Sequence, residues 1–170
     1  MNSADVAGLL LRVVVGVIMI AHGYNHLLGG GKIAGTARWF GGLGLRPPLA
    51  HAWMSVLVEL AAGIGLIVGL LTSVAAMATV AVMSVAGIAA HRKNGFYVFK
   101  DGYEYVLLIA VVCVAIAITG PGRASLDHAI GIDHDLDGSV GAAISLAGIL
   151  AALGMLAVCW RPSRPVTTAD

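Results

Sequence analysis

Five stretches of the chain are almost continuously apolar, and each is long enough or nearly long enough to cross a lipid bilayer. They cover residues 6–28, 50–71, 74–90, 103–119 and 140–160. A membrane-spanning helix needs about 20 such residues. The first, second and fifth runs meet this length, whereas the third and fourth need flanking residues. The pattern therefore predicts an all-α, polytopic membrane bundle of five transmembrane helices.

The segment between the first two runs, residues 29–49, has a pattern of its own. Three consecutive glycines open it, and Ile33, Ala37, an aromatic residue at 39 or 40, and Leu43 then recur at helical spacing. An apolar face of this kind is typical of a short helix that lies on the membrane surface. We expect such a helix here.

The composition supports a membrane protein. Apolar residues make up 59% of the chain and charged residues 11%, against roughly 25% charged residues in soluble domains. The net charge of +1 gives no basis for binding nucleic acid. The lipid bilayer is the partner that the composition predicts.

Positive charges are distributed unequally between the two ends of the predicted helices. Two fall on one side, Arg12 and Arg123. Eight fall on the other side: Lys32, Arg38, Arg46, Arg92, Lys93, Lys100, Arg161 and Arg164. Since Lys and Arg are retained in the cytoplasm, we expect the N-terminus outside, and the C-terminal tail, residues 161–170, in the cytoplasm.

Three ionisable side chains interrupt the apolar runs at similar depth. His22 and Glu59 each lie ~9 Å in from the same end by helix rise, and Glu104 lies slightly shallower. Such groups face the bundle interior, have partners and often mark functional sites. We predict that His22, Glu59 and Glu104 line a proton-relay or ligand pocket. A hydrogen-bonded structural lock is the alternative.

Three further residues are expected to support this layer, namely His26, Tyr103 and His91. His22 and His26 are four apart and share a helix face. The two histidines with a glutamate suggest metal ligation, but no HExxH or ExxH sequence is present, so no metal site is predicted there.

A second acidic group follows the fourth run. Asp133, Asp135, Asp137 and Gly138 match the first half of a calcium-binding loop. The position of the bidentate acid is occupied by Ile144. The three aspartates are therefore weak metal candidates, and an acidic solvated turn is the preferred interpretation.

The two cysteines do not suggest a disulfide. Cys113 and Cys159 fall near opposite faces of the predicted bundle, ~20 Å apart in depth by helix rise. That separation is too large for a disulfide within the chain. Both are interpreted as small buried residues.

Several segments resemble the DoxX family of small bacterial membrane proteins. They cover roughly residues 7–128 and include Leu11-Arg12, Ala21-His22-Gly23, Glu59-Leu60-Ala61-Ala62-Gly63, Asn94-Gly95-Phe96, Gly102-Tyr103-Glu104-Tyr105 and Ser125-Leu126-Asp127. The resemblance implies a four-helix membrane domain over 1–128. The acidic loop and last helix, 129–160, would be an addition. His26 stands where the family pattern has lysine.

The resemblance also implies a functional context. Proteins of this family are associated with membrane redox systems, so we expect a quinone-linked redox or oxidative-stress role in the bacterial inner membrane. The chain would be a subunit of an oxidoreductase complex rather than a stand-alone enzyme, with no intrinsic cofactor, although a quinone could bind. A redox protein or a second copy of the chain could be its partner. A non-catalytic scaffold and a small-solute transporter remain alternatives.

Overall fold

The computed structural model describes residues 1–162, and within them the chain is all-helical. The predicted fold class is confirmed. The end of the predicted tail, residues 163–170, lies outside the described residues. The helices are α1 (Ser3–Leu28), α2 (Lys32–Leu43), α3 (Pro48–Val68), α4 (Thr72–Ala86), α5 (Glu104–Thr119), α6 (Leu126–Ala129) and α7 (Gly138–Cys159).

Four of these helices are long and apolar enough to span a membrane. They are α1, α3, α7, and α4 together with its continuation to Asn94. The continuation confirms that the third apolar run draws on flanking residues. Helix α5 has 16 residues and is shorter than the other four. Its crossing of the membrane therefore stays a prediction.

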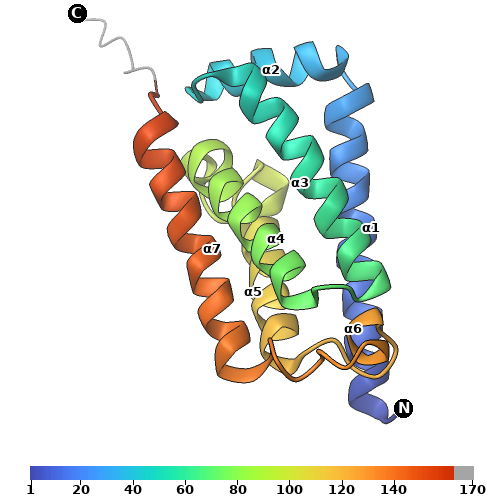
Figure 1. Ribbon diagram of the computed structural model, residues 1–170. Helices are drawn as coiled ribbons and strands as arrows, with labels where there is room; N and C mark the ends of the chain where they lie inside the picture. The colour runs from blue at the N-terminus through green and yellow to red at the C-terminus, as the bar shows by residue number, and fades with distance from the viewer. Residues whose placement is uncertain (163–170) are drawn as a thin grey trace, which may run out of the picture.

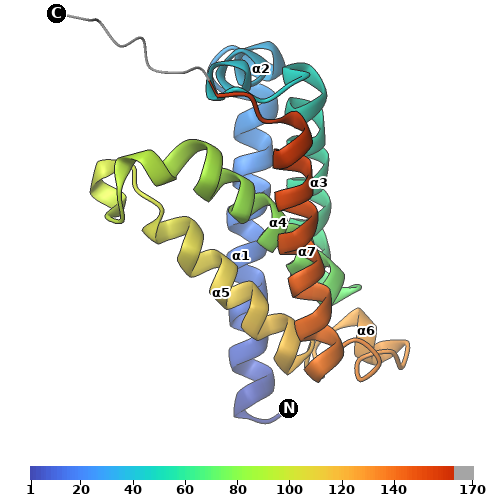
Figure 2. The same cartoon turned by 90° about the vertical axis from the view of Figure 1, so that its left-hand side faces the viewer.

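The long helices form one bundle, with the short helices at its two ends (Figure 1). Helix α2 lies across one end, near the last turn of α7, and α6 lies at the opposite end near the N-terminus. Figure 2 shows that α4 and α5 meet at a tip that stands away from α1 and α3. The N-terminus and the last turn of α7 lie at opposite ends of the bundle.

The end of α7 is fixed to the turn between α2 and α3. The Trp160 indole donates to the carbonyl of Leu43 at 2.8 Å, and the Arg161 amide donates to that of Gly44 at 2.8 Å. The short helix predicted between the first two runs is confirmed as α2. Hydrogen bonds from the two residues that follow α7 thus hold α2 across the bundle end.

Helices α1 and α3 cross in close contact at two glycines. A Cβ atom on Gly16 would lie 2.6 Å from the carbonyl oxygen of Gly63, and one on Gly63 would lie 2.7 Å from that of Gly16. Backbones approach this closely only where side chains are absent. The crossing brings the middle of α1 against α3 and sets which residues face each other further along.

Valine at Gly16 is therefore expected to disrupt the bundle. Overpacking costs about 1–3 kcal/mol, and here the obstacle is backbone that cannot rotate away. The melting temperature in detergent should fall for Gly16→Val. The matched control is Gly8→Val on the same helix, where an added Cβ meets nothing within 4 Å. Equal melting temperatures for the two variants would contradict the proposed crossing.

A buried arginine connects α1 to the α6 end of the bundle. Arg12 is fully buried, with 0% exposure. Its guanidinium donates to the carbonyl oxygens of Ala124 at 2.5 Å and Leu66 at 3.4 Å. These two bonds give the buried guanidinium partners that the apolar run alone would not supply, while its Nε has no partner within residues 1–162.

Asp127 of α6 lies near that arginine and caps α4. Its two carboxylate oxygens accept hydrogen bonds from the amides of Leu71 at 2.6 Å and Thr72 at 2.8 Å. The carboxylate is 3% exposed and supplies a nearby opposite charge for Arg12. A negative group at a helix N-terminus also interacts favourably with the helix dipole. We call Arg12 and Asp127 the terminal latch.

Helix α4 changes its winding before the tip. Residues Gly87–His91 form a π-helical turn, followed by a 3-10 turn at Arg92–Asn94. Single π turns in α-helices occur frequently at functional sites. This turn ends at His91, whose Nδ1 lies 2.9 Å from the carbonyl oxygen of Asp101.

Candidate functional site

One face of α3 carries three polar residues spaced four apart, His51, Ser55 and Glu59. The spacing places them one above another on the helix. The Ser55 hydroxyl donates to Glu59 Oε1 at 2.6 Å. Glu59 is 3% exposed, and its Oε2 has no hydrogen-bond partner among the described residues. This carboxyl group is thus buried and only half satisfied.

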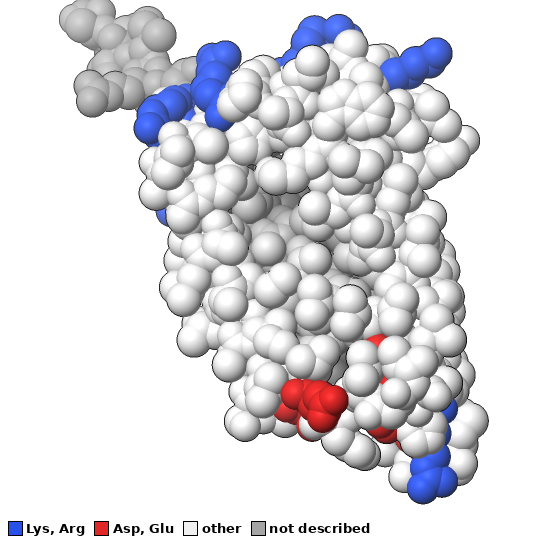
Figure 3. All heavy atoms as spheres, in the orientation of Figure 1, with Lys and Arg blue, Asp and Glu red and all other residues white. Residues whose placement is uncertain are grey.

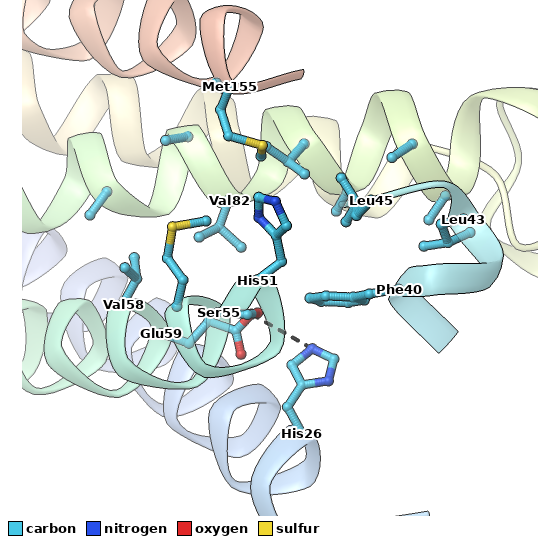
Figure 4. Close-up of a pocket in the computed structure, with 18 of the residues that line it drawn as sticks. His26, Phe40, Leu43, Leu45, His51, Ser55, Val58, Glu59, Val82 and Met155 are labelled. Atoms are coloured by element: carbon cyan, nitrogen blue, oxygen red, sulfur yellow. Dashed lines mark hydrogen bonds and ion pairs between the residues drawn. The ribbon is translucent and has the colours of Figure 1, made fainter. Parts of the chain in front are cut away.

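The ionisable neighbour of Glu59 is His26 on α1. His26 Nε2 lies 3.7 Å from Glu59 Oε1, and a dashed line marks this contact in Figure 4. At this distance the two groups interact electrostatically but are too far apart for a good hydrogen bond. The His26 ring also packs on α2, with ring centroids 5.8 Å from Trp39 and 5.7 Å from Phe40. Helix α2 therefore fixes the imidazole beside the carboxyl.

His51 presents a second unsatisfied polar atom. The residue is buried, and its Nε2 lies 3.2 Å from the carbonyl oxygen of Arg46. A carbonyl only accepts, so Nε2 carries the proton, and Nδ1 is left as an acceptor. Nδ1 is buried and has no partner within residues 1–162.

Glu59 and His51 line one cavity of about 390 Å³, which we call the apolar cavity. It lies between α2, α3, α4 and α7, and its volume is in the range of small-molecule sites, roughly 300–1,000 Å³. On the space-filling view the surface is hollowed between α7 and α3, beneath α2 (Figure 3). Besides the polar groups, its walls include Phe40, Leu43, Leu45, Met54, Val58, Ala78, Ala81, Val85, Ala152 and Met155.

A second cavity of about 520 Å³ lies on the other side of Glu59, and we call it the polar cavity. Its lining includes His22, Asn25, His91, Asp101 and Tyr105, from α1, the end of α4, the tip and α5. The two cavities share five lining residues: His26, Trp39, Glu59, Val82 and Ala86. The His26–Glu59 pair thus stands at the boundary between an apolar and a polar space.

The structure brings together only some of the residues singled out from the sequence. His22, His26, Glu59 and His91 all line the polar cavity. The Glu104 carboxylate instead accepts a hydrogen bond from the amide of Val98 at 2.9 Å and lines neither cavity. Because Glu104 lies at the start of α5, its carboxylate contacts the tip between α4 and α5 and not the cavities.

Tyr103 is also separate from the cluster. Its ring packs edge-on against Phe96, with centroids 5.5 Å apart, and it lines neither cavity. Conversely, sequence analysis missed His51 and Ser55. Their four-residue spacing from Glu59 was the available signal, because it places all three on one helix face.

The acidic loop forms histidine–aspartate contacts. His128 Nδ1 lies 2.6 Å from Asp133 Oδ2, and this hydrogen bond lowers the pKa of Asp133. His134 Nδ1 lies 3.1 Å from Asp137 Oδ2, which raises the pKa of His134. Within the described part of the chain, no group of three His, Cys, Asp or Glu residues is placed to hold a metal ion.

We therefore expect no tight calcium binding by this loop. Two of its three aspartates contact histidines, and Ile144 occupies the position of the bidentate ligand. Calorimetry with calcium should give no binding in the micromolar range. Micromolar binding that is lost in Asp135→Ala would contradict this expectation.

Comparison with known proteins agrees with the resemblance seen in the sequence. The DoxX family model matches residues 7–92, just over half of the chain. A protein of Bacillus subtilis (strain 168) named "Putative oxidoreductase CatD" is 28% identical over 126 residues, which cover 74% of this chain and 88% of that protein. No solved structure matches the chain. Because the family model covers more than half of the chain, this all-helical bundle with four helices able to span a membrane belongs to the DoxX family.

Proposed function

We propose that this protein is a membrane subunit of an oxidoreductase system and binds the head group of a quinone or quinol in the apolar cavity. One observation carries the proposal. Glu59 Oε2 and His51 Nδ1 are buried, lack protein partners in residues 1–162, and belong to residues that line one otherwise apolar cavity. Buried polar atoms are almost always hydrogen-bonded, so a ligand with polar groups on an apolar body would complete both.

A quinol head group has the required chemistry. Its ring is apolar, and its two hydroxyl groups can each donate a hydrogen bond. One hydroxyl would donate to His51 Nδ1, which can only accept in the tautomer that binds Arg46. The other would meet Glu59, which accepts when ionised and donates to a quinone carbonyl when protonated. His51 Nδ1 has no proton to donate to a quinone carbonyl in this tautomer. The cavity is therefore expected to bind the reduced form, the quinol, more tightly than the quinone.

The position of the cavity supports access from the membrane. The hollow between α3 and α7 opens on a surface that carries few charged residues (Figure 3). A lipid-soluble molecule could enter there without crossing the aqueous phase, and its isoprenoid tail could remain among the lipids. The name of the Bacillus subtilis relative, an oxidoreductase, is consistent with this assignment.

The test is purification in mild detergent followed by extraction of lipid-soluble quinones and titration with a short-chain benzoquinol and its oxidised form. Trp39 lines the cavity, so quenching of tryptophan fluorescence should report binding. We expect the quinol to bind more tightly than the quinone, and His51→Phe to remove that preference. Leu57→Ala on the exposed side of α3 is the control. Absence of bound quinone together with absence of quenching would reject the proposal, and co-purifying enzymes without quinone would favour a scaffold.

We further propose that the chain lies in the bacterial inner membrane with its N-terminus outside. In Figure 3 most of the visible Lys and Arg lie at the α2 end of the bundle, whereas the acidic residues lie at the α6 end beside fewer basic ones; this distribution supports a cytoplasmic α2 end. In a variant with Cys113→Ala and Cys159→Ala, an impermeant thiol reagent applied to intact cells should label Ile130→Cys and leave Lys93→Cys unlabelled. The reverse pattern would overturn the orientation.

A further inference from the structure

The polar cavity places a series of titratable side chains between Glu59 and the surface of the α4–α5 tip. Starting from Glu59, His26 Nε2 lies 3.7 Å from the carboxylate. The His26 and His22 ring centroids are 6.5 Å apart. His22 lies well inside α1, yet it is exposed, and it lines this cavity.

The outer end of the series is His91 with Asp101. His91 Nδ1 lies 3.3 Å from Asp101 Oδ1, and the Asp101 side chain is 77% exposed. Both residues line the same cavity as His22 and Glu59. The side chains thus run from a buried carboxyl to one that is in contact with solvent.

The π-helical turn gives this arrangement a backbone basis. Gly87–His91 is wound with one residue more per turn than the rest of α4. The extra residue changes the direction of His91 relative to a regular α-helix. The turn ends at the residue that, with Asp101, forms the outer end of the series.

We propose that the polar cavity is the route by which Glu59 exchanges protons with the aqueous phase, with His91 and Asp101 at its mouth and His22 and His26 along its length. The inference deepens the proposed function and rests on it, because a site that converts quinone to quinol must receive protons and the reverse reaction must release them. Neither His91 nor Asp101, the two residues at the mouth of the route, lines the apolar cavity.

Along the route the histidines pass protons on, and only the groups at its two ends, Glu59 and the aqueous phase, gain or lose a proton. Each imidazole accepts a proton at one ring nitrogen as another leaves from the second nitrogen, so the ring ends as the other tautomer with no net change of charge. The His22–His26 gap is too long for direct transfer. A cavity of about 520 Å³ has room for bridging water, which occupies roughly 30 Å³ per molecule.

The described titratable groups that face this route are few. They are His22 and His26 from α1, Glu59 from α3, His91 from the end of α4, Asp101 from the tip and Tyr105 from α5. Glu104 is nearby in sequence, but its carboxylate accepts from the Val98 amide and does not line the cavity. Helix α2 contributes Trp39, which holds His26 by ring stacking.

The experiment measures how fast Glu59 responds to a pH jump. The full-length protein in lipid nanodiscs is followed by time-resolved infrared spectroscopy, and the Glu59 carboxyl band is assigned by its loss in Glu59→Gln. We expect His22→Phe and His91→Phe, which block the cavity with an apolar ring, to slow the response at least tenfold. The control is Ala21→Phe, an exposed position beside His22 on α1.

Three outcomes would overturn the proposal. The Glu59 band could fail to respond in the unaltered protein, both histidine variants could respond as fast as the unaltered protein, or Ala21→Phe could slow the response equally. If the phenylalanine variants fold poorly, a measurement of thiol reactivity tests the route instead. In the variant without native cysteines, a hydrophilic reagent should label His22→Cys at least tenfold faster than Ala21→Cys, and equal rates would exclude an aqueous route.

Failure of the proton route and failure of the quinone site would give different results in these experiments. Binding of the short-chain quinol is measured on the unaltered protein. Quinol binding with no effect of the histidine substitutions on the Glu59 response would reject the route alone. A response that depends on His22 and His91 in a protein that binds no quinone or quinol would reject the proposed function and leave the route in place.

Discussion

Glutamine in place of Glu59 is expected to lower quinol affinity by about 10–100-fold and to leave the fold intact. The amide oxygen can still accept from Ser55, so the local packing and the 2.6 Å bond survive. The second carboxylate oxygen, Oε2, has no partner within residues 1–162, and in glutamine an amide NH2 group that cannot take up a proton takes its place. The loss corresponds to about 1.4–2.8 kcal/mol, within the range for a hydrogen bond to a charged group. Quinol titration and melting temperature together measure it.

A double-mutant cycle with His26 tests whether the two side chains act together. His26→Ala alone should also weaken binding, and the effects of the two substitutions should not add. The interaction energy between neighbours in one network is about 0.5–3 kcal/mol. A purely structural lock predicts the opposite pattern, with a lower melting temperature for Glu59→Gln and unchanged quinol binding. Val82→Ile, which alters a wall shared by both cavities, shows the effect of volume alone.

Alanine at Asp127 is expected to have the largest effect on stability. It removes both hydrogen bonds that cap α4 and leaves the fully buried Arg12 without its nearby opposite charge. Removing one member of a buried charge pair costs about 3–5 kcal/mol. At about 2–4 °C per kcal/mol for a chain of this length, the melting temperature should fall by roughly 6–20 °C. A thermal melt in detergent measures the shift.

Two comparisons separate the latch from general effects. Asp127→Asn keeps an acceptor for one α4 amide but loses the charge, so its melting temperature should lie between those of Asp127→Ala and the unaltered protein. Asp135→Ala removes an exposed aspartate from the neighbouring loop and should leave the melting temperature within about 1 °C. An Asp135→Ala shift as large as that of Asp127→Ala would contradict the latch.

Helix positions and depths could be predicted from the sequence because both follow from the length of apolar runs. Glu59 and His22 were placed at one level by counting residues, and both line the polar cavity. Rotation about the helix axis could not be obtained in this way. His22 and His26 share a face, and which of them approaches Glu59 depends on how α1 crosses α3. The Gly16–Gly63 crossing places His26 there.

The remaining differences arise from contacts between distant segments. From the sequence, Arg12 could be placed only as a positive charge on one side of the bundle, because its partners, Ala124 and Leu66, are 112 and 54 residues away. Glu104 fell at a suitable depth, yet the tip offers it the amide of Val98, only six residues away. This local hydrogen bond gives the carboxylate a partner without any contact between helices. The periodicity of apolar residues does not indicate such a contact.

If α5 crosses the membrane as predicted, its shortness has a consequence for the surrounding lipid. Its 16 residues rise ~24 Å, whereas the hydrocarbon layer of a typical bilayer is about 30 Å thick. A hydrophobic segment shorter than the bilayer is accommodated when the membrane thins locally or when flanking residues reach toward the interface. Thinning beside α5 would bring lipid head groups and water to the α4–α5 tip, where His91 and Asp101 lie. Acyl-chain length in the host membrane would then set how well that region is hydrated, and short-chain lipids would suit this protein best.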